Sequence, residues 1–195
     1  MLKNGDHESK TDEELVALTL ENQGYFLYLI KRYEKKLLNY IIRISGVSKE
    51  EAEDILQETF IKIYQNLNDF DTSLKFSSWA YRIAHNQTIS NHRKNKARPQ
   101  NIFLDPENDF LENLASDLDL KQEIDLDFLK KNINEILARI DEKYREILVL
   151  KFLEQKSYKE ISDILKKPMG TVATLINRAK EQFREVAEKV NIQLR

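Results

Sequence analysis

Residues 76–98 combine aromatic, amide and basic side chains in a pattern suited to holding unstacked bases. Aromatic rings stack on any base, amides read base edges, and arginine or lysine neutralises phosphate. The side chains that could bind a single strand in this way are Trp79, Arg82, Asn86, Asn91, Arg93 and Lys94. Aromatic residues at helical spacing are more often core, so Phe76 is expected to be buried and Trp79 fits either role.

Residues 50–67 indicate a different chemistry, because their charged residues up to Glu58 are all acidic. On a helix, one face of this segment would be mostly apolar and buried. That face comprises Ala52, Ile55, Leu56, Thr59, Phe60, Ile63 and Leu67. A second face carries four residues that we call the acidic ridge: Asp54, Gln57, Glu58 and Ile61. A polar strip with an apolar edge suits protein binding, although a solvated face with acids in the first turn would look the same.

Capping signals predict where the helices of this part of the chain begin and end, including the helix that carries the acidic ridge. Thr11 with Glu14 fits a capping box, and so does Ser48 with Glu51, which would open the acidic helix. Between them a break is expected at Gly24, followed by a helix over residues 25–45 that Gly46 would terminate.

The loop predicted over residues 68–75 is rich in Asn, Asp, Thr and Ser, as turns require. It precedes a helix expected to begin near Phe76 or Ser77. Next to Trp79 and Asn86, such a loop could line a pocket for one extruded base, or it could be an ordinary connector.

After Pro99 the composition changes to an acidic segment, followed from about residue 126 by a second helical unit. The acidic segment is either a solvated spacer or a mimic of nucleic acid that enters a basic channel. In the second unit, Ser157 is expected to cap a helix, and residues 167–170 to form a tight turn before a last helix from Thr171 to about residue 190.

These last two helices fit a helix-turn-helix, in which the start of the second helix reads the major groove. Many such pairs are only structural. The residues offered to DNA would be Thr171, Ala173, Thr174, Asn177, Arg178 and Lys180, with Arg184 also within reach of phosphate.

Composition excludes several classes of function. The 195-residue chain has no cysteine, so it can form neither a disulfide nor a thiolate metal site. Asp54 and Glu58 could bind a metal in principle, but no complementary ligand cluster is visible, and no Gly-rich phosphate loop is present. We therefore expect an all-α protein that is not an enzyme and needs no cofactor. With no signal peptide or bilayer-spanning segment, a cytoplasmic location is expected.

The two units together resemble a bacterial sigma factor of the extracytoplasmic-function type, over about residues 11–190. The segment AEDILQETFIKIY looks like the part of the family that binds core RNA polymerase. FSSWAYRIAHNQTISNHRK looks like the part that melts and reads the −10 element, and SYKEISDILKKPMGTVATLINRAKE looks like the −35-reading helix-turn-helix. The resemblance implies a region 2 domain over residues 11–98, an acidic linker over 99–125 and a region 4 domain over 126–190.

The resemblance also implies roles for individual residues. Polymerase binding falls on Asp54, Gln57, Glu58 and Ile61; −10 binding on Trp79, Arg82, Asn86, Asn91, Arg93 and Lys94; −35 binding on Thr171, Ala173, Thr174, Asn177, Arg178 and Lys180. One departure concerns the recognition helix, where the family usually has a base, Ser and Arg after GTV. This chain has Ala173, Thr174 and Leu175 instead, so its −35 contact is expected to be weaker or differently specified.

The predicted function is therefore transcription initiation. The implied partners are core RNA polymerase, promoter DNA as −35 duplex and −10 single strand, and an anti-sigma factor as regulator. The alternative is a stand-alone helix-turn-helix regulator that binds duplex DNA as a dimer and needs neither the acidic ridge nor Trp79.

Overall fold

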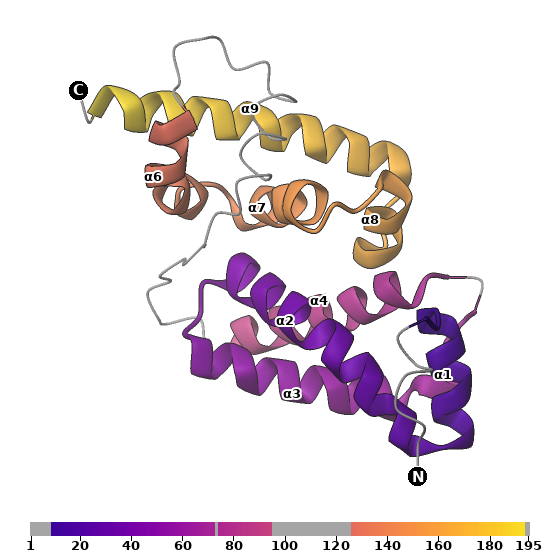
Figure 1. Ribbon diagram of the computed structural model, residues 1–195. Coiled ribbons are helices and arrows are strands. Elements are labelled where there is room, and N and C mark those ends of the chain that lie inside the picture. The colour runs from indigo at the N-terminus through magenta and orange to yellow at the C-terminus, as the bar shows by residue number, and fades with distance from the viewer. Residues whose placement is uncertain (1–8, 73, 95–125, 194–195) are drawn as a thin grey trace.

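The computed structural model describes residues 9–72, 74–94 and 126–193, with side chains for residues 9–72, 74–91 and 131–190. Every regular element in these ranges is helical, as an all-α protein requires. The helices form two groups (Figure 1), which we call the N-terminal module (residues 9–94) and the C-terminal module (residues 126–193). Within the described ranges, each helix is too short or too polar to traverse a lipid bilayer.

Local capping fixes the ends of the helices in the N-terminal module. The elements are α1 (Asp12–Glu21), η1 (Gln23–Tyr25), α2 (Phe26–Ser45), α3 (Lys49–Gln65), η2 (Leu67–Asp69) and α4 (Phe76–Lys94). The Thr11–Glu14 capping box is present, and Ser48 Oγ accepts from the backbone N–H of Glu51. Gly46 ends α2 in the left-handed conformation, with φ of 67°. These boundaries confirm the sequence-based ones.

One cap in this module joins residues that are distant in the chain. The backbone N–H of Phe76, at the start of α4, donates to Glu13 Oε1 of α1 at 2.9 Å. Asp12 Oδ1 accepts from Arg32 Nη1 of α2 at 2.6 Å. Through these two neighbouring acids, α1 is tied to both α2 and α4.

The C-terminal module consists of α6 (Leu126–Ala138), α7 (Glu142–Leu148), the π-helical η3 (Val149–Leu153), α8 (Tyr158–Leu165) and α9 (Met169–Gln193). Ser157 and Glu160 form the expected capping box at the start of α8. Asp141 precedes α7, but its side chain makes no capping hydrogen bond there.

The turn of the helix-turn-helix differs from the one expected. The predicted turn over residues 167–170 is wrong, because Met169 and Gly170 already belong to α9. Lys166 ends α8 with φ of 52°, and the carbonyl of Pro168 accepts from the N–H of Val172 in the first turn of α9. Pro is favoured at a helix start because its missing N–H would have no partner there. The turn is therefore Lys166–Pro168, and Gly170 is not needed for it.

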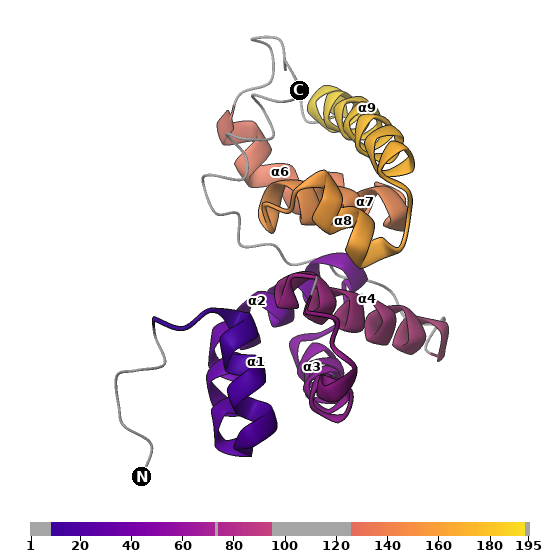
Figure 2. The same ribbon diagram turned by 90° about the vertical axis from the view of Figure 1, so that its right-hand side faces the viewer.

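The two modules pack against each other through specific helices. Helix α4 lies along α8, and α2 contacts α7 and η3. Figures 1 and 2 show α7 and α8 directly above α2 and α4, while α3 lies on the opposite side of the N-terminal module. No pattern in the sequence indicated this arrangement, since two helical domains on a linker need not touch.

Two glycines provide a matched test of the helix boundaries. Gly46→Ala is expected to lower the free energy of unfolding by about 1–2 kcal/mol, because a Cβ strains the left-handed conformation. Gly170→Ala is expected to raise it by about 0.5–1 kcal/mol, because the helix favours Ala and the new Cβ meets no atom within 4 Å. Urea denaturation followed by circular dichroism measures both changes, and equal signs would contradict the assigned conformations.

Candidate protein- and nucleic-acid-binding surfaces

The acidic ridge is an exposed surface of α3. Asp54, Gln57, Glu58 and Ile61 are all exposed, while the predicted apolar face of the same helix is buried except for the half-buried Phe60. Ile61 is 56% exposed, and the neighbouring Tyr64 is exposed as well. Glu58 Oε2 accepts from Gln87 Nε2 of α4 at 3.0 Å, which holds this carboxylate in place. An exposed apolar side chain next to acids, one of which is held in place, is the arrangement expected of a protein-binding site.

The loop before α4 is anchored by aromatic packing. The buried Phe70 of the loop lies 5.2 Å from Trp79 and 5.8 Å from Phe76, measured between ring centroids. Asn68, Asp69, Asp71 and Thr72 of the loop are exposed. The loop therefore presents polar groups to solvent from a rigid aromatic base, and the described part of residues 68–75 lies beside α4 as expected.

Trp79 belongs to this aromatic base in the conformation observed. Its side chain is only 6% exposed, so it has no free face on which a base could stack. Its predicted DNA contact stays a prediction, and such a contact would require Phe70 to move. Asn86 is exposed, and Arg82 and Asn91 are half-buried, so these side chains line the outer side of α4. The side chains of Arg93 and Lys94 lie outside the described residues.

The start of α9 offers the predicted recognition residues to solvent. Thr171, Thr174, Asn177 and Arg178 are exposed, whereas Ala173 and Lys180 are half-buried. Thr174 Oγ1 donates to the carbonyl of Gly170 at 3.0 Å, so this hydroxyl is partly engaged within its own helix. Ile161, Ile164, Val172 and Ile176 of α8 and α9 are buried, and Leu165 is half-buried. Helices α8 and α9 thus have the contacts of a helix-turn-helix.

A polar cluster between the modules was not anticipated from the sequence. Glu154, after η3, accepts from Arg43 Nη1 at 3.1 Å and from the hydroxyl of Tyr81. Their ion-paired side chains are only 7% (Glu154) and 9% (Arg43) exposed. Lys156 lies over the Tyr81 ring, 4.3 Å from its centroid. Burial raises the pKa of Glu154 and of Tyr81, and it lowers the pKa of Lys156, because each charged form loses water.

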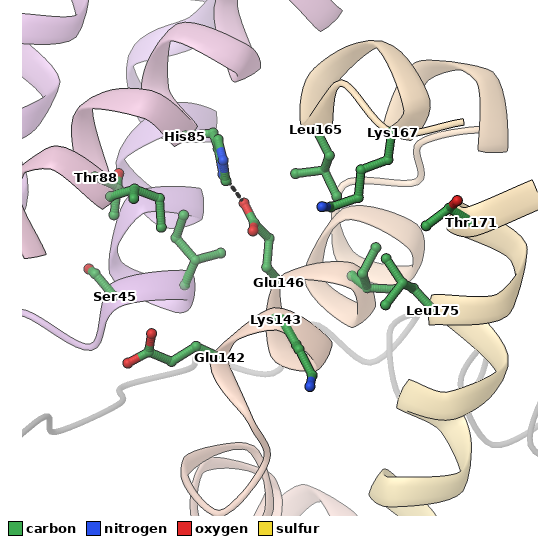
Figure 3. Close-up of a pocket in the computed structure, with 13 residues that line it drawn as sticks. Ser45, His85, Thr88, Glu142, Lys143, Glu146, Leu165, Lys167, Thr171 and Leu175 are labelled. Carbon is green, nitrogen blue, oxygen red and sulfur yellow. Dashed lines mark hydrogen bonds and ion pairs between the residues drawn. The ribbon is translucent and has the colours of Figure 1, made fainter. Parts of the chain in front are cut away.

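A second cluster lies at the edge of a cavity between the modules. Glu146 Oε1 of α7 accepts from the Tyr40 hydroxyl at 2.6 Å and lies 2.5 Å from His85 Nδ1 of α4. Burial, followed by the charge of Glu146, raises the pKa of Tyr40 well above its usual value. The cavity has a volume of about 430 Å³, and Figure 3 shows His85 and Thr88 on one side of it, and Lys167 and Thr171 on the other.

A third contact involves the loop before α4. Lys75 Nζ lies 3.0 Å from Glu160 Oε1 of α8. Burial opposes ionisation of Glu160, but hydrogen bonds from Ser157 and Lys75 outweigh it and lower its pKa to about 2. Periodicity could not reveal these contacts, because single Glu and Tyr residues on amphipathic helices usually face solvent. One sign in the sequence was an acid, Glu146, directly before the apolar run of residues 147–150.

The described residues contain no group of three or more His, Asp or Glu side chains arranged to hold a metal ion. Asp54 and Glu58 are exposed on α3 and have no further acid or His converging on them in that set.

Family models match both modules. Sigma-70 region 2 matches residues 29–98, and sigma-70 region 4 matches residues 130–183. The chain is 36% identical over 171 residues to the ECF RNA polymerase sigma factor SigW of Bacillus subtilis (strain 168), which covers 84% of this chain and 89% of that protein. It is 30% identical over 181 residues to the ECF RNA polymerase sigma-E factor of Haemophilus influenzae, covering 90% and 95%.

Solved structures share the fold. CnrH in complex with the cytosolic domain of CnrY superposes with a TM-score of 0.67 at 23% identity, over 92% of this chain and 99% of that one. The sigma factor RpoE of Bartonella quintana, in complex with the anti-sigma factor NepR, gives 0.62 at 20% identity, over 84% and 96%. The chain belongs to the sigma-70 family, as an RNA polymerase sigma factor of the extracytoplasmic-function type. The stand-alone helix-turn-helix regulator is not favoured, because region 2 accounts for most of the N-terminal module.

The burial of Trp79 leads to a test of its contribution to stability. Trp79→Ala is expected to lower the free energy of unfolding by about 3–5 kcal/mol, because it leaves a cavity beneath Phe70. Asn86→Ala, on the exposed side of the same helix, is expected to change it by less than about 0.5 kcal/mol. Chemical denaturation monitored by far-UV circular dichroism measures both, and a small effect at Trp79 would place this ring outside the core.

Proposed function

We propose that this sigma factor directs core RNA polymerase to promoters through three separate surfaces. The acidic ridge on α3 binds polymerase, α4 and the preceding loop hold the opened −10 strand, and the start of α9 contacts the −35 duplex. The functional units are residues 11–98 and 126–190, joined by the acidic linker 99–125. The protein acts by binding alone, with no catalytic step or cofactor of its own, and works in the cytoplasm, where polymerase and promoters are.

The observation that carries this proposal is the exposure of the acidic ridge on a helix whose apolar face is buried in the core except for the half-buried Phe60. Four residues predicted to bind polymerase form one continuous exposed face, and Ile61 at its end is more than half exposed. A buried apolar anchor surrounded by polar groups gives most of the affinity in many protein interfaces. Ile61 is suited to be that anchor, with Asp54 and Glu58 selecting a basic partner.

The −10 contact is supported by the outer side of α4. Arg82 and Asn86 follow one another at helical spacing, and the exposed loop residues of 68–72 lie at the end of that side. An extruded base needs hydrogen-bonding groups around a pocket and a positive charge for its phosphate. The exposed loop residues and Asn86 offer the hydrogen-bonding groups, Arg82 offers the charge, and Trp79 holds the loop through its contact with Phe70.

The proposed −35 contact depends mainly on two exposed side chains of α9. Asn177 and Arg178 are exposed on α9; Asn177 can make a bidentate contact to a base edge, and Arg178 can contact a base edge or a phosphate. Leu175 is half-buried and lines the cavity between the modules, so it does not replace the missing basic residue. The C-terminal module should therefore position the protein more than it discriminates between sequences.

Regulation by an anti-sigma factor completes the set of partners. One solved structure with this fold is CnrH in complex with the cytosolic domain of CnrY, and another is the sigma factor RpoE in complex with the anti-sigma factor NepR. A partner of that class would act by competing with polymerase or promoter for the surfaces described above.

Removal of the ridge charges tests polymerase binding. Asp54→Ala with Glu58→Ala is expected to weaken binding to core polymerase at least tenfold, since each charged contact at an interface contributes on the order of 1–2 kcal/mol. Ile61→Ala should weaken it by a similar factor through loss of the apolar anchor. Fluorescence anisotropy of labelled protein titrated with core polymerase gives both values.

The matched control removes two exposed acids outside the ridge. Glu34→Ala with Glu53→Ala changes the net charge by the same amount and should leave the affinity within about twofold. Equal losses for the two double variants would mean that overall charge, and not the ridge, determines polymerase binding.

Salt dependence tests phosphate contact by α9. For holoenzyme binding to promoter DNA, Arg178→Gln is expected to make the slope of log K against log salt shallower by about 0.9, because one fewer counterion is released. Lys189→Gln, at the far end of the same helix, should leave the slope unchanged. Filter binding from low to moderate salt measures the slopes, and an unchanged slope for Arg178→Gln would remove this residue from the phosphate contacts.

A further inference from the structure

The cavity between α4, α7 and the start of α9 is lined mainly by apolar side chains. Its volume of about 430 Å³ is that of a site for a small organic molecule. Both modules contribute aliphatic side chains to its wall, namely Ile44, Ile89, Ile147, Leu165 and Leu175. Ile89, Leu165 and Leu175 are only half-buried, so apolar surface is left uncovered inside the cavity. A ligand that displaces water from this surface would gain free energy.

Leu175 gives the part of the wall formed by α9 its apolar character. It lies at one of the two positions where this chain lacks the base that the family usually has. An arginine at this position would place a guanidinium group at the cavity, and an apolar ligand would then have to bind against a charge. Leucine instead supplies aliphatic surface opposite His85 and Thr88 of α4 (Figure 3). The departure from the family pattern therefore favours an apolar ligand here.

A positive charge at the same wall is available to that ligand. Figure 3 shows the Lys167 side chain extending from the turn before α9 toward the middle of the cavity. Its ammonium group has no hydrogen-bond or ion-pair partner among the described residues. Thr171 lies beside it in the first turn of α9, where the helix dipole adds to the positive potential. A negatively charged head group would therefore bind at this end of the cavity.

The acids of the wall leave this end free for an anion. Glu146 accepts hydrogen bonds from the Tyr40 hydroxyl and from His85, so its charge is stabilised within the protein. Figure 3 shows the Glu142 carboxylate at the opposite end of the cavity from Lys167. The charges are thus separated along the cavity, with the cation at the end where the half-buried Leu165 and Leu175 lie.

We propose that this cavity is a binding site for a small amphipathic anion with an aliphatic or aromatic body and a single carboxylate. The body contacts Ile89, Leu165 and Leu175, and the carboxylate binds Lys167. Because both modules form the wall, a bound ligand favours their packed arrangement by its difference in affinity for the packed and separated states. The site goes beyond the proposed function, since neither polymerase nor promoter takes part in forming it.

Octanoate is a suitable probe, because it carries the carboxylate on a simple aliphatic chain. It is titrated into the natural full-length chain with isotope-labelled Ile and Leu methyl groups, and binding is followed by NMR. The methyl signals of Ile89 and Leu175 are expected to shift in a saturable manner. Leu27 of α2 is 51% exposed but lies outside the cavity, so its signal should stay in place. Octanol, which lacks the charge, is expected to bind about fivefold more weakly.

Two variants separate the charge from the apolar wall. Lys167→Met is expected to weaken octanoate binding about fivefold and to change octanol binding by less than twofold. Lys159→Met removes the same charge from an exposed site of α8 outside the cavity, and should change neither affinity by more than twofold. Leu175→Arg should weaken octanol binding at least tenfold, followed at the Ile89 signal, because a guanidinium group replaces apolar surface. Circular dichroism checks that each variant is folded.

Three results would overturn the proposal. Without saturable shifts at Ile89 and Leu175 in the natural chain, the cavity takes no ligand of this class. Equal losses of octanoate affinity in Lys167→Met and Lys159→Met would mean that overall charge, and not Lys167, attracts the anion. Unchanged octanol binding in folded Leu175→Arg would place the ligand elsewhere. These measurements use the free chain, so a failure of the proposed promoter function would leave their outcome unaffected.

Discussion

Two buried carboxylates impose the main constraint on this structure. Glu146 and Glu154 are removed from water, and a buried ionised carboxylate is unstable unless donors surround it. The described hydrogen-bond partners of both lie in the N-terminal module, not in the helices that carry the acids. The donors that stabilise these two acids of the C-terminal module therefore come from α2 and α4, with which the module is in contact.

Helix α4 shows how one segment can serve three surfaces. Phe76, Ala80 and Ala84 are buried in the core, Tyr81 and His85 face the other module, and Arg82 and Asn86 face outward. Each set repeats at a spacing of four residues, so each occupies its own side of the helix. The core stripe needs only apolar residues, whereas the other two need particular polar groups, which is why a single hydrophobic period cannot describe this helix.

The sequence predicted what local chemistry determines. Capping at Thr11, Ser48 and Ser157, the left-handed Gly46 and the buried face of α3 all depend on residues a few positions apart, and the structure has them. The predicted position of the turn in the helix-turn-helix was wrong because Lys166, not a glycine, adopts the left-handed conformation. Pairs such as Tyr40 with Glu146 join residues 106 positions apart, and no periodic pattern specifies such a partner. The position of Trp79 was open for a similar reason, since it depends on packing by Phe70 from the loop.

The acidic ridge is separate from the contacts that join the two modules. It lies on α3, which faces away from the C-terminal module in both views, and its four residues are exposed although the modules are together (Figures 1 and 2). The main contacts between the modules are made by α2 and α4 with α7, η3 and α8. A ligand shifts a conformational equilibrium only by its difference in affinity for the two states. A partner that touches the ridge alone would bind equally well whether or not the modules are packed together, so its binding would leave their arrangement unchanged.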